Sequence, residues 1–189
     1  MERRVFGPPG TGKTTFLTKE IRRAASQFGP DAVFVSSFTR AAAAELVGRD
    51  LPVDQSNIGT LHSHCYRLLG NPRIADTPEG LEAWSAENPK YALSHKAIDE
   101  DAYVDEGPSK EDSDKVFTEY RLNRLRMVPR DEWKPEVVEF AKHWEEWKTA
   151  TGTMDFTDLL ETVYHDWGRF PGNIKVGFID EAQDLCPLA

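Results

Sequence analysis

The sequence has few cysteines and no long hydrophobic run, and each absence excludes a class of protein. Cys65 and Cys186 are the only cysteines among 189 residues, too few for the disulfide framework of a small secreted domain. No apolar run approaches the roughly 18 residues of a membrane span. Residues 1–4 lead into a β-prone run rather than a signal peptide. We therefore expect a cytoplasmic protein with no membrane partner.

Positive charge is outnumbered by negative charge, and it is unevenly spread. The chain carries 23 Lys and Arg against 32 Asp and Glu, a formal net charge of −9, which argues against wholesale coating of nucleic acid. Residues 1–69 nevertheless contain nine basic and six acidic side chains, whereas residues 70–189 contain 14 and 26. We expect an anionic partner to meet the N-terminal portion first.

The stretch GPPGTGKT at residues 7–14 fits the phosphate-binding pattern G-x-x-x-x-G-K-[ST]. Glycines permit positive φ, so that successive backbone N–H groups can point at phosphates. Lys13 would place its charge against the β- and γ-phosphates, and the Thr14 hydroxyl would ligate Mg²⁺. A plain glycine- and proline-rich turn would not explain the β-prone run before it or the helical pattern after it. The predicted nucleotide-binding residues are Gly7, Pro8, Pro9, Gly10, Thr11, Gly12, Lys13, Thr14 and Thr15.

Strand and helix patterns alternate on either side of a less regular middle. Short apolar runs predict strands at 32–35, 57–60 and 176–179, and residues 3–6 are β-prone. Apolar residues at three-to-four-residue spacing predict helices over 15–28, 40–46 and 61–69. We therefore expect an α/β fold, a parallel sheet with helices on both faces, which binds ligands at the carboxyl ends of its strands.

Residues 70–150 differ in character, and we expect them to form a helical insertion. Residues 71–114 are polar and interrupted by prolines, and the acidic run at 99–114 predicts a solvated loop. Helices are expected over 115–127 and after Pro135, with Trp144 and Trp147 in the core rather than stacking on bases. The arginines of this region predict a solvated face, with a nucleic-acid patch as the alternative: Arg121, Arg124, Arg126 and Arg130.

After the insertion, residues 155–160 begin a helix that Asp155 or Thr157 can cap. The strand at 176–179 then delivers Asp180 and Glu181 to the carboxyl edge of the sheet. Asp180 can hold Mg²⁺, directly or through water, and Glu181 can activate the water that attacks the γ-phosphate. The long separation between Lys13 and Asp180 requires an inserted domain.

Together these motifs resemble the UvrD/PcrA/Rep-type superfamily 1A DNA helicases. Residues 37–42 with 45–46 are similar to motif Ia of that family, residues 59–63 with 67 to motif Ib, and residues 180–184 to motif II. Residues 155–160 are similar to the segment that re-enters the first RecA-like domain. Leu61 departs from the pattern, because the family usually has Phe there. The resemblance adds Gln183 to the catalytic set of Lys13, Asp180 and Glu181, and it implies DNA contacts by Phe38, Thr39, Arg40, Thr60, His62 and Arg67.

The resemblance also implies an organisation and an activity. Residues 1–69 together with 151–189 would form a RecA-like ATP-binding domain, and 70–150 an inserted helical subdomain. ATP and Mg²⁺ would be the cofactors and single-stranded DNA the partner of a monomer that moves 3′ to 5′. The family's second RecA-like domain and its arginine fingers are not in this sequence, so we expect nucleotide binding without unwinding. The alternatives are a non-motor nucleotide-binding interaction module, or another P-loop enzyme such as an AAA+ ATPase or a kinase.

A metal-binding alternative exists at residues 62–65, which read His-Ser-His-Cys. No second ligand pair lies at zinc spacing. We expect His62 to be a DNA-facing or packing residue instead.

Overall fold

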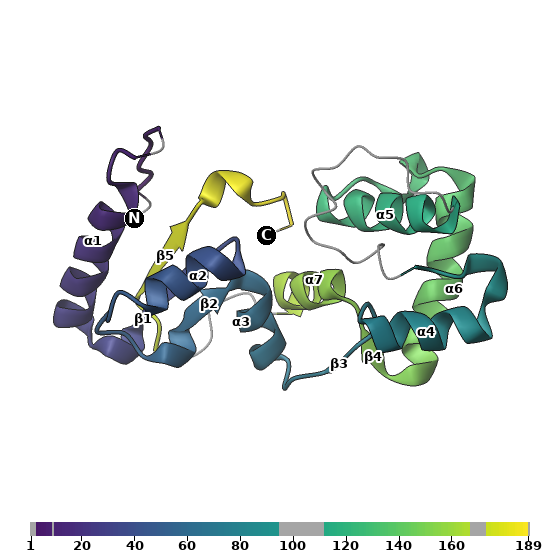
Figure 1. Cartoon of the computed structure of the whole chain (residues 1–189), viewed down its shortest axis with the longest axis horizontal. Coiled ribbons are helices and arrows are strands. Elements are labelled where there is room, and N and C mark those ends of the chain that lie inside the picture. Colours follow the sequence, from purple (N-terminus) through teal and green to yellow (C-terminus); the bar gives the residue numbers. More distant parts are fainter. Residues whose placement is uncertain (1–2, 9, 95–111, 167–172, 189) are drawn as a thin grey trace. The chain divides into compact units, whose positions relative to one another are not determined.

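The computed structural model describes residues 3–8, 10–94, 112–166 and 173–188 (Figure 1). The chain divides into two compact units. Unit 1 comprises Met1–Cys65 and Trp167–Leu185, and unit 2 comprises Tyr66–Asp166 and Cys186–Ala189. Unit 2 therefore includes residues 151–166, and the domain boundaries expected from the sequence stay a prediction.

Unit 1 is built on a three-stranded parallel sheet. Its spatial order is β2 (Ile58–Thr60), β1 (Val33–Ser37), β5 (Val176–Asp180). Every residue of β1 pairs with one of β5, from Val33 opposite Val176 to Ser37 opposite Asp180. β1 is buried along its whole length, as its continuous apolar run predicts for a central parallel strand. The parallel α/β architecture is confirmed.

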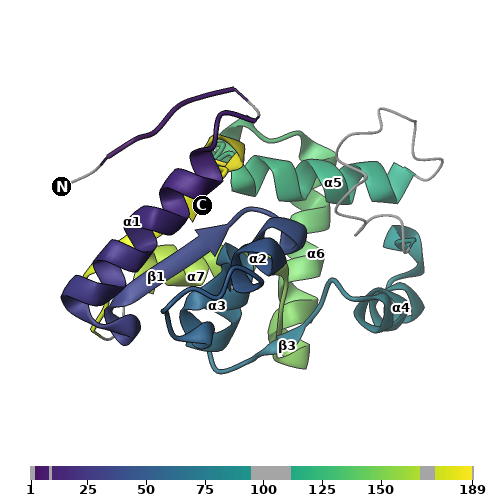
Figure 2. The ribbon, with the colours of Figure 1, turned by 60° about the vertical axis from the view of Figure 1, so that its left-hand side comes forward.

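Helices cover both faces of this sheet. Val33 and Val35 point to one face, where they form a buried cluster with Ile21 of α1 (Lys13–Phe28) and Leu46 of α2 (Arg40–Val47). Figure 2 shows α1 running alongside β1. Phe34 points to the opposite face, where its ring lies 4.3 Å from that of His64 in α3 (Leu61–Leu68). Short 3₁₀ turns complete the unit at η1 (Pro30–Ala32), η2 (Gln55–Asn57) and η7 (Ala182–Asp184).

One strand expectation in unit 1 is wrong. Residues 3–6 have no regular secondary structure, and the Phe6 side chain is 86% exposed. Two of these four residues are arginines, so the run has little apolar surface to bury against β5, the edge strand of the described sheet. A short run of moderate β propensity does not form a strand without such packing.

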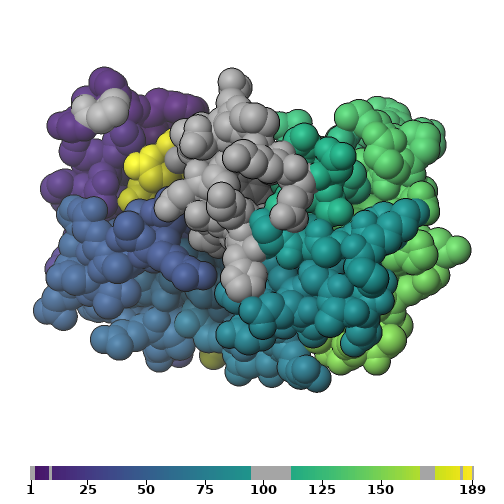
Figure 3. All heavy atoms as spheres, turned by 45° about the vertical axis from the view of Figure 1, so that its right-hand side comes forward, coloured from purple at the N-terminus to yellow at the C-terminus, as the bar shows by residue number. Residues whose placement is uncertain are grey.

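Unit 2 is mainly helical. Its helices are α4 (Pro78–Glu87), α5 (Asp112–Leu125), α6 (Pro135–Thr151) and α7 (Phe156–Asp166). A parallel pair of two-residue strands, β3 (Arg73–Ile74) and β4 (Thr153–Met154), joins its beginning to its end. The turns η3 (Pro89–Tyr91) and η6 (Arg130–Glu132) link the helices. α4, in teal, contributes side chains to the surface of unit 2 (Figure 3). Among the helices that the structure describes, none is long and apolar enough to cross a membrane.

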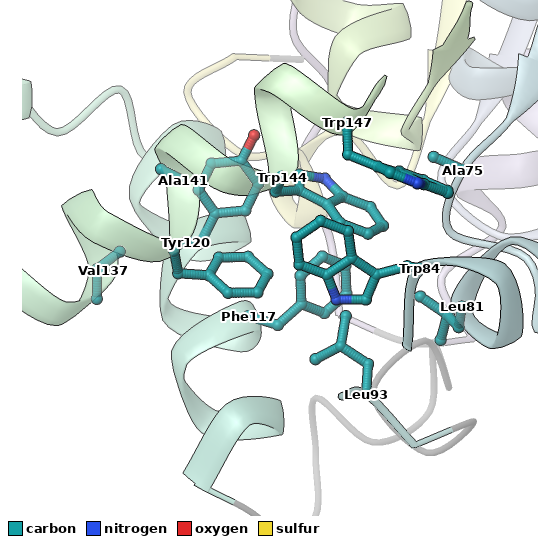
Figure 4. Close-up of a cluster of buried hydrophobic side chains, with 11 residues drawn as sticks. Ala75, Leu81, Trp84, Leu93, Phe117, Tyr120, Val137, Ala141, Trp144 and Trp147 are labelled. Carbon is teal, nitrogen blue, oxygen red and sulfur yellow. The ribbon is translucent and has the colours of Figure 1, made fainter. Parts of the chain in front are cut away.

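The core of unit 2 is aromatic (Figure 4). Trp84 of α4 makes edge-to-face contacts with Trp144 at 5.0 Å and with Trp147 at 5.6 Å. Phe117 of α5 lies 5.2 Å from Trp144. Such pairs are favourable beyond the area that they bury, typically by about 0.5–1.5 kcal/mol each. The prediction that Trp144 and Trp147 belong to the core is confirmed.

Beside this aromatic core lies a cluster of buried charges. Arg124 of α5 pairs with Asp155 at 2.9 Å and with Asp158 at 2.6 Å. Lys148 of α6 reaches the same two carboxylates, at 2.6 and 2.5 Å. Glu161 completes the set through a second pair with Arg124. Buried charges persist only where they are paired in this way, so the cluster fixes α7 against α5 and α6.

The solvated-face expectation is therefore wrong for Arg124, and also for Arg121, which is 8% exposed. The acidic run holds a further correction. Residues 99–111 of it lie outside the described residues, but Asp114 is buried in α5, where its carboxylate accepts hydrogen bonds from Ser94 N and Oγ. In both cases a charged side chain that looks solvent-facing in sequence has buried partners from another segment.

Candidate nucleotide-binding site

The loop at residues 7–14 has the backbone that its glycines predict, apart from Pro9, which is outside the described residues. Gly10 and Gly12 have φ values of +78° and +81°, in the left-handed region that favours glycine. Gly12 is also the N-cap of α1, which begins at Lys13. Thr11 closes the turn, because its Oγ1 donates to Pro8 O at 2.7 Å. The first-turn N–H groups of α1 thus follow directly from the loop, an arrangement suited to an anion.

Lys13 lies against the loop rather than extending into solvent. Its Nζ donates to Gly7 O at 2.8 Å and to Pro8 O at 3.3 Å. These are neutral carbonyl acceptors, for which a phosphate oxygen is a stronger substitute because it carries charge. The ammonium is therefore held at the loop in a position from which a nucleotide phosphate can recruit it.

A cleft of about 830 Å³ in unit 1 brings the predicted catalytic residues together. Lys13 lines it from the start of α1, and Asp180, Glu181 and Gln183 line it from the end of β5. Arg3 and Arg4 are further lining residues, as are several apolar side chains of α1 and β5. The structure thus unites residues that are far apart in sequence, at the carboxyl edge where parallel sheets bind ligands.

Asp180 is the buried acid of this cleft. Burial raises the pKa of its carboxyl group, and the hydrogen bond from Glu181 N, 3.2 Å from Oδ1, and the charge of Lys13 oppose the rise. A bound cation would favour the charged form further. Carboxylate and hydroxyl oxygens are what Mg²⁺ prefers, so Asp180 and the half-buried Thr14 fit the ion expected from the sequence.

Glu181 has an unusual backbone. Its φ of +54° is in the left-handed region, which a residue with a side chain seldom adopts. Gln183 Nε2 donates to the Glu181 carboxylate. Strained residues held by their surroundings are frequent at functional sites, and this turn directs the chain from β5 into η7.

The predicted DNA-contacting residues follow strand ends, but two of their hydroxyls are already used. Thr39 caps α2 by accepting from Ala42 N at 3.1 Å. Thr60 accepts from Ser63 N at 3.2 Å at the start of α3. Phe38, between β1 and α2, is 47% exposed. Of the other members of the set, Arg40 and Arg67 are exposed and His62 is half-buried; Arg67 belongs to unit 2.

Ser37 and His64 were not among the predicted site residues: Ser37 entered only as the first residue of the stretch similar to motif Ia, and His64 only in the metal-binding alternative. His64 is buried in α3, with Nε2 3.2 Å from Val35 O and its ring against Phe34. Helical spacing carried a signal for its burial, since His64 lies three residues after Leu61 and four residues before Leu68. Across the described ranges no group of three or more His, Cys, Asp or Glu residues could hold a metal ion.

Comparison with known proteins agrees with these motifs. The family model for the UvrD/REP helicase N-terminal domain matches residues 2–189. "Putative ATP-dependent DNA helicase YjcD" of Bacillus subtilis (strain 168) is 24% identical over 210 residues, a match that covers 97% of this chain and 27% of that protein. The chain thus spans about a quarter of the length of this curated relative.

Proposed function

Because this chain belongs to the UvrD/REP helicase N-terminal domain family, we propose that it is the ATP-binding part of a DNA helicase or translocase. The observation that carries the proposal is the cleft of unit 1, in which Lys13 meets Asp180, Glu181 and Gln183. ATP hydrolysis in this cleft would be coupled to movement along single-stranded DNA, in the 3′-to-5′ direction of the family that the motifs resemble.

Each residue of the cleft has a distinct task in this proposal. The amides of residues 10–14 and the Lys13 ammonium bind the β- and γ-phosphates. Thr14 and Asp180 hold Mg²⁺, which neutralises the phosphate charge when bound. Glu181 orients and deprotonates the attacking water. The hydrogen bond from Gln183 fixes the Glu181 carboxylate in position before nucleotide arrives.

Single-stranded DNA would cross the carboxyl edge of the sheet. Exposed Phe38 offers a stacking surface for a base, and Arg40 of the same unit offers a phosphate contact. Arg67, which belongs to unit 2, stays a proposed phosphate contact on the strength of the family resemblance alone. Thr39 and Thr60 would contribute chiefly by capping the helices that present these groups, with His62 beside them. The proposed active form is a monomer in which residues 1–69 and 151–189 form the RecA-like domain, 70–150 is an insertion, and a second RecA-like domain closes the site.

The other candidates differ in what they require. Membership of the helicase family argues against an AAA+ ATPase or a kinase. A module that binds nucleotide without turnover would use the same cleft, so it is distinguished by hydrolysis and not by binding.

Lys13→Ala tests the site directly. The change removes the one basic side chain of residues 7–14, so we expect MgATP affinity to fall by about 10–100-fold, the range for charge-assisted hydrogen bonds of about 1.5–3 kcal/mol. Titration calorimetry on the 189-residue chain measures it.

Lys19→Ala is the matched control, because Lys19 is an exposed lysine on the same helix. It should bind MgATP as the unaltered protein does. Equal nucleotide affinity in Lys13→Ala and the unaltered protein would contradict the site assignment.

A further inference from the structure

Ser37 occupies a central position at the carboxyl edge of the sheet. It is the last residue of β1, and its partners in register are Thr60 of β2 on one side and Asp180 of β5 on the other. Three polar side chains therefore end three adjacent parallel strands. Ser37 lies directly between Asp180, the acid of the nucleotide cleft, and Thr60, the residue that precedes α3.

The register also fixes the direction of these side chains. Residues paired across parallel strands point to the same face, and residues two apart along a strand do so as well. Ser37 therefore shares its face with Val35, which packs against Ile21 of α1. Since α1 begins at Lys13, Ser37 and Asp180 are both directed to the side of the sheet that carries the phosphate loop.

The Ser37 hydroxyl is buried and has no hydrogen-bond partner within the described part of the chain. The residue is 1% exposed, and no described group makes a hydrogen bond with its Oγ. A buried hydroxyl without a partner is unfavourable, by about 1–3 kcal/mol, and such groups are rare in native proteins. The neighbouring hydroxyls of Thr39 and Thr60 differ, because each caps a helix.

A hydroxyl that serves only packing could be replaced by a methyl group. Ser37 lies beside Asp180 in register. Its hydroxyl is therefore placed to gain a hydrogen-bond acceptor when Mg²⁺ and nucleotide occupy the cleft. A carboxylate that holds a metal ion is normally itself hydrogen-bonded by a neighbouring donor, which orients it and tunes its basicity. Among the residues paired with Asp180 or next to it in the chain, Ser37 has a side-chain donor on the correct face.

We infer that Ser37 is a positioning residue of the nucleotide site, whose hydroxyl donates a hydrogen bond to the Asp180 carboxylate when Mg²⁺ and nucleotide are bound. The inference rests on the proposed function, and it adds a role to a residue of the motif otherwise expected to touch DNA. Because Phe38 follows Ser37 directly, the same hydrogen bond ties the acid of the cleft to the turn proposed to stack on a base.

The test uses Ser37→Ala, Ser37→Thr and Ser36→Ala in the 189-residue chain. Ser36 is the matched control: it is 2% exposed and adjacent, but it is paired with Gly59 and Ile179 and so points to the opposite face. Binding of a non-hydrolysable ATP analogue is measured against Mg²⁺ concentration at fixed pH. Thermal unfolding is recorded with and without the ligand pair.

We expect Ser37→Ala to need about tenfold more Mg²⁺ for half-saturation, the lower end of the loss for a hydrogen bond to a charged group. Without ligand, its unfolding midpoint should equal or exceed that of the unaltered protein, because an unpartnered buried hydroxyl has been removed. Ser37→Thr keeps the hydroxyl, so it should need the same Mg²⁺ concentration as the unaltered protein. Ser36→Ala should also leave this concentration unchanged.

Three results would overturn the inference. The first is an unchanged Mg²⁺ requirement in Ser37→Ala. The second is a Ser37→Thr variant that needs as much Mg²⁺ as Ser37→Ala does. The third is a lower ligand-free unfolding midpoint in Ser37→Ala, which would show that the hydroxyl has an internal partner. If the unaltered protein binds no Mg²⁺–nucleotide, the proposed function itself fails, and this result is distinct from the other three.

Discussion

Phe38 and Phe28 are exposed to nearly the same extent, 47% and 45%, yet only Phe38 follows a strand at the carboxyl edge of the sheet. Phe38→Ala should weaken single-stranded DNA binding by about 1–3 kcal/mol, the value of one stacked base. Phe28→Ala, at the far end of α1, should leave it unchanged. Fluorescence anisotropy of a labelled oligonucleotide at several salt concentrations measures both, and an equal loss in both variants would show that the surface is misplaced.

A change at Glu181 distinguishes nucleotide binding from ATP hydrolysis. Glu181→Gln keeps the size of the side chain and removes only its ability to accept a proton, so Mg²⁺–nucleotide affinity should change by less than about threefold while ATP hydrolysis is lost. Single-turnover hydrolysis in a protein of the relative's full length measures this. Undiminished hydrolysis would show that another group activates the water.

At the scale of elements, Asp76 ties the residues after β3 to the start of α7, because its Oδ1 accepts from Phe156 N at 3.0 Å. The side chain is 2% exposed, and Oδ2 has no partner among the described residues. Burial and the nearby charge of Asp155 raise the pKa of Asp76 to about 7, against the lowering effect of Arg121. The folded state therefore binds a proton that the unfolded state releases at about pH 4.

A raised carboxyl pKa favours folding at low pH, and this contribution is lost as the pH rises from about 4 through 7. Asp76→Asn cannot titrate, so its stability relative to the unaltered protein should increase by roughly 1–4 kcal/mol between pH 5 and pH 8. Urea unfolding at each pH measures it.

Asp112→Asn serves as the control for that series, since the Asp112 side chain is fully exposed on α5. Its stability difference from the unaltered protein should not vary over the same pH range. A flat profile for Asp76→Asn as well would show that Asp76 is ionised throughout.

The elements also show what sequence could and could not predict. The strands β1, β2 and β5 and the helices α1, α2 and α3 were predicted to within a few residues, because apolar periodicity and glycine breaks mark them locally. The cap of α7 was predicted too: Asp155 Oδ1 accepts from Asp158 N at 2.8 Å, and Asp158 Oδ2 accepts from Asp155 N at 2.8 Å.

Most features that the sequence did not predict depend on contacts between segments far apart in the chain, and α4 was missed for its composition. α4 was overlooked because its segment is polar and begins at a proline, although Trp84 is fully buried. β3 and β4 are two residues long and exist only because distant segments meet. Arg124 looked solvent-facing because its partners, Asp155 and Asp158, lie some 30 positions away. The orphaned Ser37 hydroxyl likewise became evident only from strand register.

At the scale of the whole molecule, the cleft holds a complete set of ground-state groups, but the proposal assigns transition-state arginines to a second domain. We expect the 189-residue chain to bind MgATP and to hydrolyse it about 10³–10⁵-fold more slowly than a protein of the relative's full length, the factor associated with such an arginine. DNA-stimulated phosphate release from the two proteins measures this. Comparable rates would show that the second domain is not the catalytic partner.

The pairing of β1 with β5 has a consequence in time. β5 ends at Asp180, roughly 140 residues after Ser37, and the helices of unit 2 are encoded between them. At synthesis rates of about 5–20 residues per second, the edge of β1 that pairs with β5 stays unpaired for roughly 7–30 s, until the ribosome has synthesised β5. The helical segment can pack during that interval, whereas the sheet and the cleft at its carboxyl edge can be completed only after β5 emerges.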